Sequence, residues 1–363
     1  MPVVVQGYQA VEHHHTIRKK GDLMRKAAKF ASRARLSHFL VVLCALCVAA
    51  FGLSSACSAD DLFVGSFNGS SSGVYEYNAT TGAFIGTFGP SDSFPLGAAF
   101  GPTGTFYVSD SDLDSVLKFN GATSTFASVG DASGIVFGPS GNLFVVSSSD
   151  PGLLTVLNGT TGALVTTSDA GGILMDPEGI TRGPDGNIYV AGGDGNNVLK
   201  FNGTTGAFIS TLVASGSGGL TSARGVAFGP DGNLYVTSFG TAQVLRFNGT
   251  TGAFIDVFAG ATGACSGLSL PRDLTFGPGG NLFVSSFGSG DVFEYNGSTG
   301  SCVSDFIPSG TGGLQGPTFL LFGTPGTGGS SVPEPSSLAL LACALAGLAL
   351  LKRRNSKLAQ TAI

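Results

Sequence analysis

The residues best suited to bind a ligand stand at matching places in a repeated sequence pattern. Glu178 and Arg224 each precede a glycine that opens a short apolar run, and Arg272 and Asp273 occupy the same place one repeat later. Two guanidinium and two carboxylate groups gathered at the mouth of a channel would suit a polar or anionic ligand such as an acidic sugar. The alternative that we favour is a set of internal salt bridges that tie neighbouring repeats together.

A second set of carboxylates, Asp110, Asp112 and Asp114, alternates with other residues in the stretch SDSDLDS. Alternating carboxylates offer the oxygen ligands that Ca²⁺ prefers, but the glycine and the closing glutamate of an EF-hand loop are missing. We therefore favour a solvated acidic turn over a calcium site. The sequence predicts no metal and no cofactor, with Ca²⁺ as the alternative.

Histidine chemistry is excluded from the part of the chain that we expect to be exported. All four histidines, His13, His14, His15 and His38, precede the cleavage site that we place after Ala59. Without histidine, the exported part cannot form a Ser-His-Asp triad, supply an imidazole acid or base, or bind a metal through imidazole. Mechanisms that depend on a histidine are therefore disfavoured.

Two cysteines, Cys265 and Cys302, fall within the part that we expect to be exported. An even number of cysteines in an oxidising compartment is compatible with a disulfide. Two buried free thiols are the alternative, because the two residues belong to different parts of their repeats and could lie on opposite faces of the fold.

The elements that position these residues come from one unit that recurs along the chain. The motif GP-x-G-N-[LI]-[YF]-V begins at Gly138, Gly183, Gly229 and Gly277, with a looser copy at Gly101, at intervals of roughly 37 to 48 residues. Each unit holds short runs of alternating apolar and polar residues between turn sequences, which predicts four strands. A lone four-stranded sheet cannot cover both of its faces, so we expect the units to stack radially as a β-propeller.

The order of the strands predicts how the ring closes. The first unit begins near Leu62 with its second strand, whereas the run from Pro317 to Phe322 repeats a first strand and has no further strands after it. We therefore expect this C-terminal strand to complete the N-terminal unit. The predicted fold is all-β, a six-bladed propeller over residues 60–322. An open β-solenoid or two β-sandwiches are the alternatives.

Composition and charge fit this fold and narrow the range of partners. The chain of 363 residues contains 58 Gly, 28 Phe and no Trp, and 11% of its residues are charged. The absence of tryptophan argues against propellers that are marked by a Trp-Asp dipeptide. Residues 60–335 include 21 acidic and 6 basic residues, so this segment repels phosphate backbones, and nucleic acid is not an expected partner.

Residues 1–59 predict an N-terminal extension followed by a signal for export. A basic stretch from Arg25 to Arg35 precedes the apolar run from Phe39 to Leu53, and small residues follow as far as Ala59. This order is typical of a secretory signal peptide, with cleavage expected after Ala59. Translation from Met24 would give a basic region of more usual length, and a lipid attached to Cys57 is the alternative to that cleavage.

The C-terminal residues predict a second targeting signal. A Gly/Ser linker at 323–331 leads to the motif Val332, Pro333, Glu334 and Pro335. The apolar run from Leu338 to Leu351 follows, and after it come the basic cluster Lys352, Arg353 and Arg354 and a tail at 355–363. The apolar run and its basic end are typical of a transmembrane helix whose basic end stays in the cytoplasm. Residues 332–354 closely resemble the PEP-CTERM domain. The resemblance implies recognition by an exosortase-like processing enzyme in Gram-negative bacteria that make extracellular polysaccharide; a plain membrane anchor is the alternative.

The repeats resemble NHL repeats and the propellers of gluconolactonases and virginiamycin lyases, through units such as PEGITRGPDGNIYVAGG at 177–193. The resemblance implies a catalytic histidine in the lyases, which this segment lacks. It implies a divalent cation held by a Glu, an Asn and an Asp in the gluconolactonases, and only Glu178 stands at a comparable place here.

These observations together favour a binding protein over an enzyme. We expect a non-enzymatic binding or structural protein of the cell surface or of the extracellular polysaccharide matrix, with polysaccharide or a surface protein as its partner. We also expect the C-terminal helix to anchor it in the inner membrane before it is sorted to the envelope. The alternative is a metal-dependent, lactonase-like hydrolase.

Overall fold

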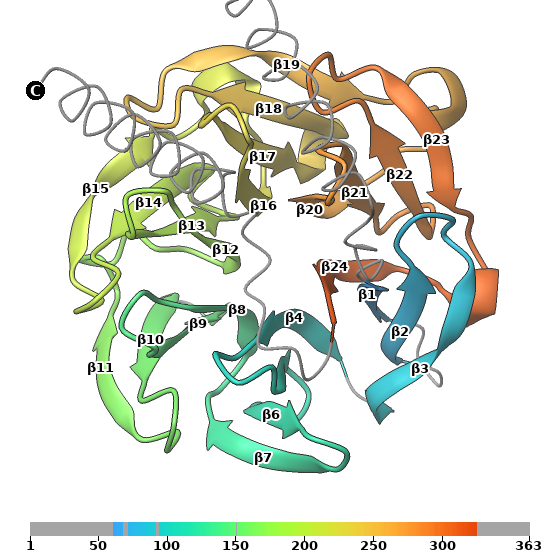
Figure 1. Ribbon diagram of the computed structural model, residues 1–363. Coiled ribbons are helices and arrows are strands. Elements are labelled where there is room, and N and C mark those ends of the chain that lie inside the picture. The colour runs from blue at the N-terminus through green and yellow to red at the C-terminus, as the bar shows by residue number, and fades with distance from the viewer. Residues whose placement is uncertain (1–60, 68–71, 92–93, 150, 325–363) are drawn as a thin grey trace, which may run out of the picture. The chain divides into compact units, whose positions relative to one another are not determined.

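The computed structural model describes residues 61–67, 72–91, 94–149 and 151–324. These residues form six sheets of four strands each, arranged as blades around a common axis (Figure 1). Strand A of each blade lies nearest the axis, and strands B, C and D follow outward. The predicted six-bladed, all-β propeller is confirmed.

The blades are numbered 1 to 6 in chain order, and each strand position is given in that order. Strand A is β24 (Pro317–Gly323), β4 (Pro95–Phe100), β8 (Ala132–Phe137), β12 (Pro177–Arg182), β16 (Ala223–Phe228) and β20 (Pro271–Phe276). Strand B is β1 (Asp61–Ser66), β5 (Phe106–Asp110), β9 (Leu143–Ser147), β13 (Ile188–Gly192), β17 (Leu234–Ser238) and β21 (Leu282–Ser286). Strand C is β2 (Gly73–Asn78), β6 (Ser115–Phe119), β10 (Leu153–Leu157), β14 (Asn197–Phe201), β18 (Gln243–Phe247) and β22 (Asp291–Tyr295). Strand D is β3 (Phe84–Ser91), β7 (Thr123–Ser128), β11 (Leu164–Ser168), β15 (Phe208–Val213), β19 (Phe254–Gly260) and β23 (Cys302–Ile307).

Within the described residues, four short 3₁₀ turns lie in the loops between the strands: η2 (Ser217–Gly219), η3 (Phe239–Thr241), η4 (Gly263–Cys265) and η5 (Thr311–Gly313). The strands alternate in direction, so the connections fall on two faces of the ring. We call the face with the D-to-A and B-to-C loops the loop face, and the face with the A-to-B and C-to-D turns the turn face.

The ring closes through pairing between the two ends of the propeller. Strand β24 pairs antiparallel with β1, with Leu62 opposite Phe322 and Asp61 opposite Gly323 (Figure 1). This is the predicted closure, extended by one residue. Asp61 is also opposite Asn78, where strand C of blade 1 meets its C-to-D turn. Asp61 and Gly323 therefore both lie at the turn face, and the chain enters and leaves the propeller there.

The hydrophobic core is divided among the interfaces between neighbouring blades. Six apolar clusters each draw their side chains from two adjacent blades. All residues of strand β13 are buried, whereas most of the outer strand β15 is exposed. The inner strands are apolar on both faces because each blade is covered by a neighbour on either side, which is why a single blade would not be stable alone.

The C-to-D turns hold each blade in register with the one before it. The side-chain oxygen of Asn202 accepts hydrogen bonds from the backbone N–H groups of Thr204 at 3.0 Å and Thr205 at 2.8 Å. The turn ends at Gly206, which has a φ of 75° and lies so close to Val156 of the preceding blade that a Cβ would stand 2.6 Å from it. Glycine is therefore required for both the backbone conformation and the contact.

The A-to-B turns carry a polar network that explains the Asp-Gly-Asn sequence of the repeat. In blade 4, Asp185 accepts hydrogen bonds from the Tyr189 hydroxyl at 2.9 Å and the Asn187 amide at 2.9 Å, and it pairs with Lys200 at 2.7 Å. Burial opposes ionisation of Asp185, but these hydrogen bonds outweigh it and lower the pKa of the carboxyl. Blade 5 repeats the arrangement with Asp231.

Candidate functional site

Every strand A begins at the loop face, so the second residues of these strands form a ring around the axis. They are Thr318, Leu96, Ser133, Glu178, Arg224 and Arg272. Neighbouring A strands approach closely because glycine follows in four blades. A Cβ on Gly134 would collide with the carbonyl oxygen of Glu178, and one on Gly179 with that of Arg224. This close approach allows side chains from three different blades to meet.

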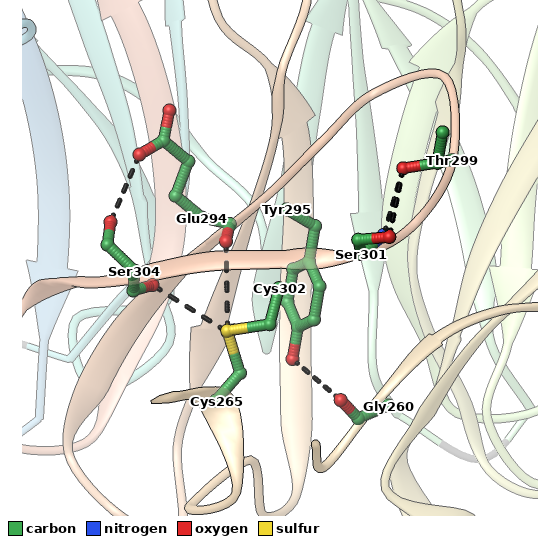
Figure 2. Close-up of a disulfide and its surroundings, with 8 residues drawn as sticks. All are labelled: Gly260, Cys265, Glu294, Tyr295, Thr299, Ser301, Cys302 and Ser304. Atoms are coloured by element: carbon green, nitrogen blue, oxygen red, sulfur yellow. Dashed lines mark hydrogen bonds between the residues drawn. A yellow bond between two sulfur atoms is a disulfide. The ribbon is translucent and has the colours of Figure 1, made fainter. Parts of the chain in front are cut away.

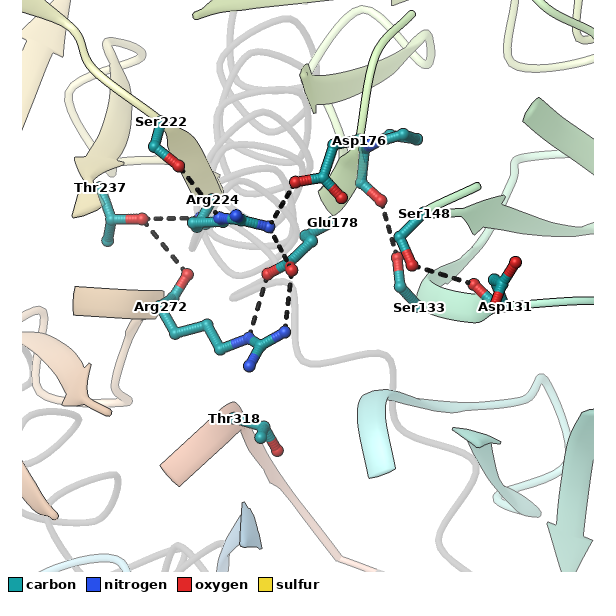
Figure 3. A network of polar contacts seen from close by, with 12 residues as sticks. Asp131, Ser133, Ser148, Asp176, Glu178, Ser222, Arg224, Thr237, Arg272 and Thr318 are labelled. Atoms are coloured by element: carbon teal, nitrogen blue, oxygen red, sulfur yellow. Dashed lines mark hydrogen bonds and ion pairs between the residues drawn. The ribbon is translucent and has the colours of Figure 1, made fainter. Parts of the chain in front are cut away.

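Glu178 of blade 4 lies between two arginines of the next two blades (Figure 3). Its carboxylate accepts hydrogen bonds from Arg272 Nε at 3.0 Å and Arg272 Nη2 at 2.8 Å, and from Arg224 Nη1. Arg224 also pairs with Asp176 at 3.0 Å. The side chains of Glu178, Arg224 and Arg272 are only 13%, 16% and 14% exposed. The structure thus joins these three sequence-predicted residues in an interblade ion-pair cluster.

The charges of this cluster balance one another. Two guanidinium groups face the carboxylates of Asp176 and Glu178, and Arg224 Nε donates a further hydrogen bond to Ser222 Oγ at 3.2 Å. Because Glu178 already accepts hydrogen bonds from both arginines, its carboxylate is engaged and is a poor ligand for a divalent cation. The cluster is therefore better suited to holding the blades together, or to contacting a neutral ligand, than to binding an anion or a metal ion.

Phenylalanine rings surround the arginines at the loop face. The Arg272 guanidinium lies 5.7 Å from the Phe94 ring centroid and 5.2 Å from that of Phe287, and Arg224 lies 5.3 Å from that of Phe239. Phe67 stacks on Phe94 with the centroids 4.2 Å apart and remains 38% exposed. Such contacts stabilise the cations electrostatically, and they leave aromatic surface at the loop face.

The structure separates Asp273 from the ion-pair cluster with which the sequence grouped it. The Asp273 carboxylate accepts a hydrogen bond from the backbone N–H of Leu320 in the adjacent blade at 2.8 Å. Burial raises the pKa of Asp273 to about 6, against the opposing effects of backbone hydrogen bonds and of Arg272. Asp273 therefore bridges blades 6 and 1 and does not meet Glu178.

The three candidate calcium ligands do not converge. Asp110 is fully buried, and its Oδ1 accepts hydrogen bonds from the backbone N–H groups of Asp112 and Leu113, both at 3.1 Å. Asp112 and Asp114 are exposed, and Asp114 Oδ1 accepts the N–H of Asp131 at 2.8 Å. Among the described residues, no group of three or more His, Cys, Asp or Glu side chains is arranged to hold a metal ion. The side chains instead fix the local turn.

Cys265 and Cys302 are joined by a disulfide with their Cα atoms 5.8 Å apart (Figure 2). Cys265 ends η4 in the loop between blades 5 and 6, and Cys302 begins the outer strand of blade 6. Cys265 Sγ also lies 3.7 Å from the carbonyl oxygens of Glu294 and Ser304. The bond fastens the D-to-A loop to the blade that it precedes.

The phenylalanines and Asp176 were missed by reasoning from the sequence alone. A signal for three of the rings is present, because a Ser-Phe pair ends strand B in three blades, at Phe67, Phe239 and Phe287. Phe94 has no such pattern, since it stands in a short loop with no equivalent in the later repeats. Its role depends on how blades 1, 2 and 6 meet.

Several predicted residues lie outside the described part of the chain. They are Ala59, Val332, Pro333, Glu334, Pro335, Lys352, Arg353 and Arg354, together with the apolar run at 338–351. Within the described part, no helix is both long and apolar enough to cross a membrane.

The end of the sequence supplies the clearest link to known proteins. Residues 331–354 match the PEP-CTERM protein-sorting motif. The chain carries a PEP-CTERM sorting motif. This motif implies export, sorting to the envelope and processing by an exosortase. No curated protein matches the sequence as a whole.

Solved structures with similar folds agree with the propeller. A chain of the nidogen/laminin complex covers 73% of this chain and 98% of its own length, with a TM-score of 0.57 and 17% identity. A protein of unknown function from Bacteroides caccae covers 72% and 98%, with a TM-score of 0.55 and 13% identity. A catalytically inactive virginiamycin B lyase from Staphylococcus aureus with quinupristin covers 75% and 94%, with a TM-score of 0.50 and 12% identity. At these identities the similarity shows the fold and carries no activity over to this chain.

Proposed function

We propose that this exported PEP-CTERM propeller is a non-enzymatic binding protein of the extracellular polysaccharide matrix and that its loop face binds polysaccharide. The sorting motif at 331–354 supports a place in the cell envelope. The fold supports a binding role, because propellers present many loops on one face around an axis. The aromatic and polar side chains at the loop face support polysaccharide as the class of ligand.

The path of the chain favours presentation of the loop face. Asp61 and Gly323 are opposite each other in the closing pair of strands, at the turn face. An anchor that follows Gly323 would therefore hold the propeller by its turn face. The loop face would then be turned toward the surroundings while the anchor is attached.

The observation that carries the proposal is the stack of Arg272 between Phe94 and Phe287, with Phe67 exposed beside it. A sugar ring has an apolar C–H face that packs on an aromatic ring and hydroxyl groups that hydrogen-bond to polar side chains. Binding sites commonly combine apolar walls with a few polar groups in this way. Because the arginines are already paired with carboxylates, a neutral sugar fits better than an acidic one.

Phe67→Ala tests the proposal with little risk to the fold, because this ring is already 38% exposed. The matched control is Phe208→Ala, on the outer strand of blade 4 and 37% exposed. Processed protein purified from the native host is run in affinity electrophoresis through gels that contain polysaccharide from the same cells. We expect retardation of the wild type and of Phe208→Ala, and about a tenfold weaker effect for Phe67→Ala, as for the loss of one aromatic contact. Equal retardation of all three proteins, or none, would refute binding at this face.

A further inference from the structure

Five Asn-Gly pairs lie at the turn face of the described propeller, each where strand C of its blade ends. They are Asn120–Gly121, Asn158–Gly159, Asn202–Gly203, Asn248–Gly249 and Asn296–Gly297. A sixth pair, at residues 68–69, lies outside the described residues. Glycine has no side chain to shield its backbone nitrogen, so this nitrogen can attack the carboxamide of the preceding asparagine when the two groups are free to approach. The five pairs share this chemistry, and the fold decides which of them can react.

Four of the five asparagine side chains are held in closed C-to-D turns. Asn158 Oδ1 accepts hydrogen bonds from the backbone N–H groups of Thr160 at 3.0 Å and Thr161 at 2.9 Å. The corresponding bonds, at 2.8 to 3.0 Å, form in three further turns, at Asn202, Asn248 and Asn296. These bonds fix the direction of the carboxamide, so its Cγ is not free to turn toward the glycine nitrogen.

The glycine of each of these four pairs is also packed against the A-to-B turn of its own blade. A Cβ on it would collide with the carbonyl oxygen of the glycine in that turn, in the pairs Gly159 and Gly141, Gly203 and Gly186, Gly249 and Gly232, and Gly297 and Gly280. Attack on the asparagine would move the glycine nitrogen. The neighbouring backbone therefore opposes the reaction at all four places.

Asn120 and Gly121 have neither restraint. Residues 120–122 alone connect β6 to β7, whereas residues 202–207 connect β14 to β15, so blade 2 lacks the longer closed turn. Asn120 has no side-chain hydrogen bond within the described part of the chain, and its backbone N–H donates to the Ala122 carbonyl at 3.3 Å. A Cβ on Gly121 would meet no atom within 4 Å. Asn158 is exposed as Asn120 is, so exposure alone does not separate the two sites.

We propose that Asn120 is a self-modification site, at which the folded propeller converts asparagine to aspartate and isoaspartate without an enzyme. The Gly121 nitrogen attacks Asn120 Cγ and gives up its proton, and the bond from Cγ to the side-chain nitrogen breaks, so that ammonia leaves. One water molecule then opens the resulting five-membered succinimide at either of its two carbonyl carbons. Opening at Cγ gives aspartate, and opening at the main-chain carbonyl carbon gives isoaspartate.

The reaction changes blade 2 in charge and in backbone length. Either product carries a carboxylate in place of a neutral amide, so an acidic propeller gains a further negative charge. Isoaspartate also adds one carbon atom to the main chain in the turn that leads to β7, an outer strand that is largely exposed. The reaction consumes only water and therefore continues after export. Because strand C ends at the turn face, it does not involve the loop face, and the proposal is independent of the proposed function.

Peptide mapping by mass spectrometry measures each site separately. The full chain is kept folded in detergent micelles in mildly alkaline buffer, samples are digested at intervals, and electron-transfer fragmentation distinguishes isoaspartate from aspartate. We expect conversion at Asn120 to be at least about tenfold faster than at the other four described sites, because each of those must first break two hydrogen bonds. In urea, where the turns are lost, all five sites should convert at similar rates.

Asn120→Gln should abolish the fast conversion, because the longer side chain would have to close a less favourable six-membered ring. Asn158→Gln is the matched control at another exposed site and should leave conversion at Asn120 unchanged. Melting temperatures well above that of the incubation show that both variants are folded. The proposal is overturned if Asn120 of the folded wild type converts no faster than the other four sites. It is also overturned if the same ranking persists in urea, because the neighbouring sequence would then set the rate.

Discussion

Glu178→Ala should destabilise the propeller far more than the loss of a carboxylate at the surface. Among the described residues, the substitution removes the one carboxylate that forms an ion pair with Arg272 and one of the two that form ion pairs with Arg224. All three side chains are at most 16% exposed, so little water is available to replace the lost partner. Breaking a buried ion pair from one side costs about 3 to 5 kcal/mol. We expect the lower end of this range, because Arg224 keeps Asp176 and Arg272 keeps its two aromatic neighbours.

The matched control is Asp256→Ala, which breaks a similar two-point contact with Arg246 at the outer strand of blade 5. There Arg246 Nε lies 3.0 Å from Asp256 Oδ1, but the Asp256 side chain is 43% exposed. An ion pair with one exposed partner contributes about 0 to 1 kcal/mol. Equilibrium unfolding in urea measures both variants, and a destabilisation of about 3 kcal/mol corresponds to a fall in melting temperature of roughly 6 to 12 °C for a domain of this size.

A double-mutant cycle then separates the lost contact from the stranded charge. Adding Arg272→Leu to Glu178→Ala removes the cation left without a carboxylate, so the double variant should be more stable than the sum of the two single changes by about 1 to 3 kcal/mol. The reasoning is refuted if Glu178→Ala costs no more than Asp256→Ala. It is also refuted if the two changes at residues 178 and 272 are simply additive.

Four further predictions follow from other parts of the chain. Because the pKa of Asp273 is raised to about 6 from 3.8, the folded state holds this proton more tightly than the unfolded chain. The contribution of Asp273 to the free energy of unfolding should therefore fall, by up to about 3 kcal/mol, as the pH rises from about 4 to about 6. Urea unfolding of Asp273→Asn measured over the same pH range should lack this fall. Deleting residues 317–323 removes strand A of blade 1 and exposes unpaired strand edges, so the truncated protein should aggregate or melt far below the wild type; an unchanged melting temperature would contradict closure by β24. Glu334→Ala should block the C-terminal cut in the native host, so that intact mass spectrometry finds the apolar run at 338–351 in the variant and not in the wild type; its presence in both would contradict processing. Cys302→Ser should lower the free energy of unfolding by roughly 2 to 4 kcal/mol under oxidising conditions, and the difference should disappear when both proteins are reduced.

Much of the fold could be predicted because its pattern is local and repeated. The alternation of apolar residues and the Gly-Pro-x-Gly-Asn turns are satisfied within one blade, so each copy predicts its own strands. The closing strand could also be predicted, since the run from Pro317 lacks the three strands that follow every other strand A. The same holds for the sorting motif at 331–354, which is a linear signal of residue types in order.

The candidate site was predicted only in part. Placing Glu178, Arg224 and Arg272 in one ring required nothing beyond the period of the repeat, and the structure does bring these three together. The same argument misplaced Asp273, whose carboxylate turns to the backbone of Leu320. The period fixes the position of a Cα atom around the axis, but it does not fix the direction of a side chain.

The sequence by itself therefore determined the type, number and order of the strands, the closure of the ring and the signal that sorts the protein. Only the tertiary structure decided which side chains meet across the blades. Arg272 lies between Phe94 and Phe287 although Phe94 is distant from it in the chain. The physical reason is that strand formation depends on local backbone pattern, whereas ion pairs and aromatic contacts depend on how closely separate blades pack around the ring.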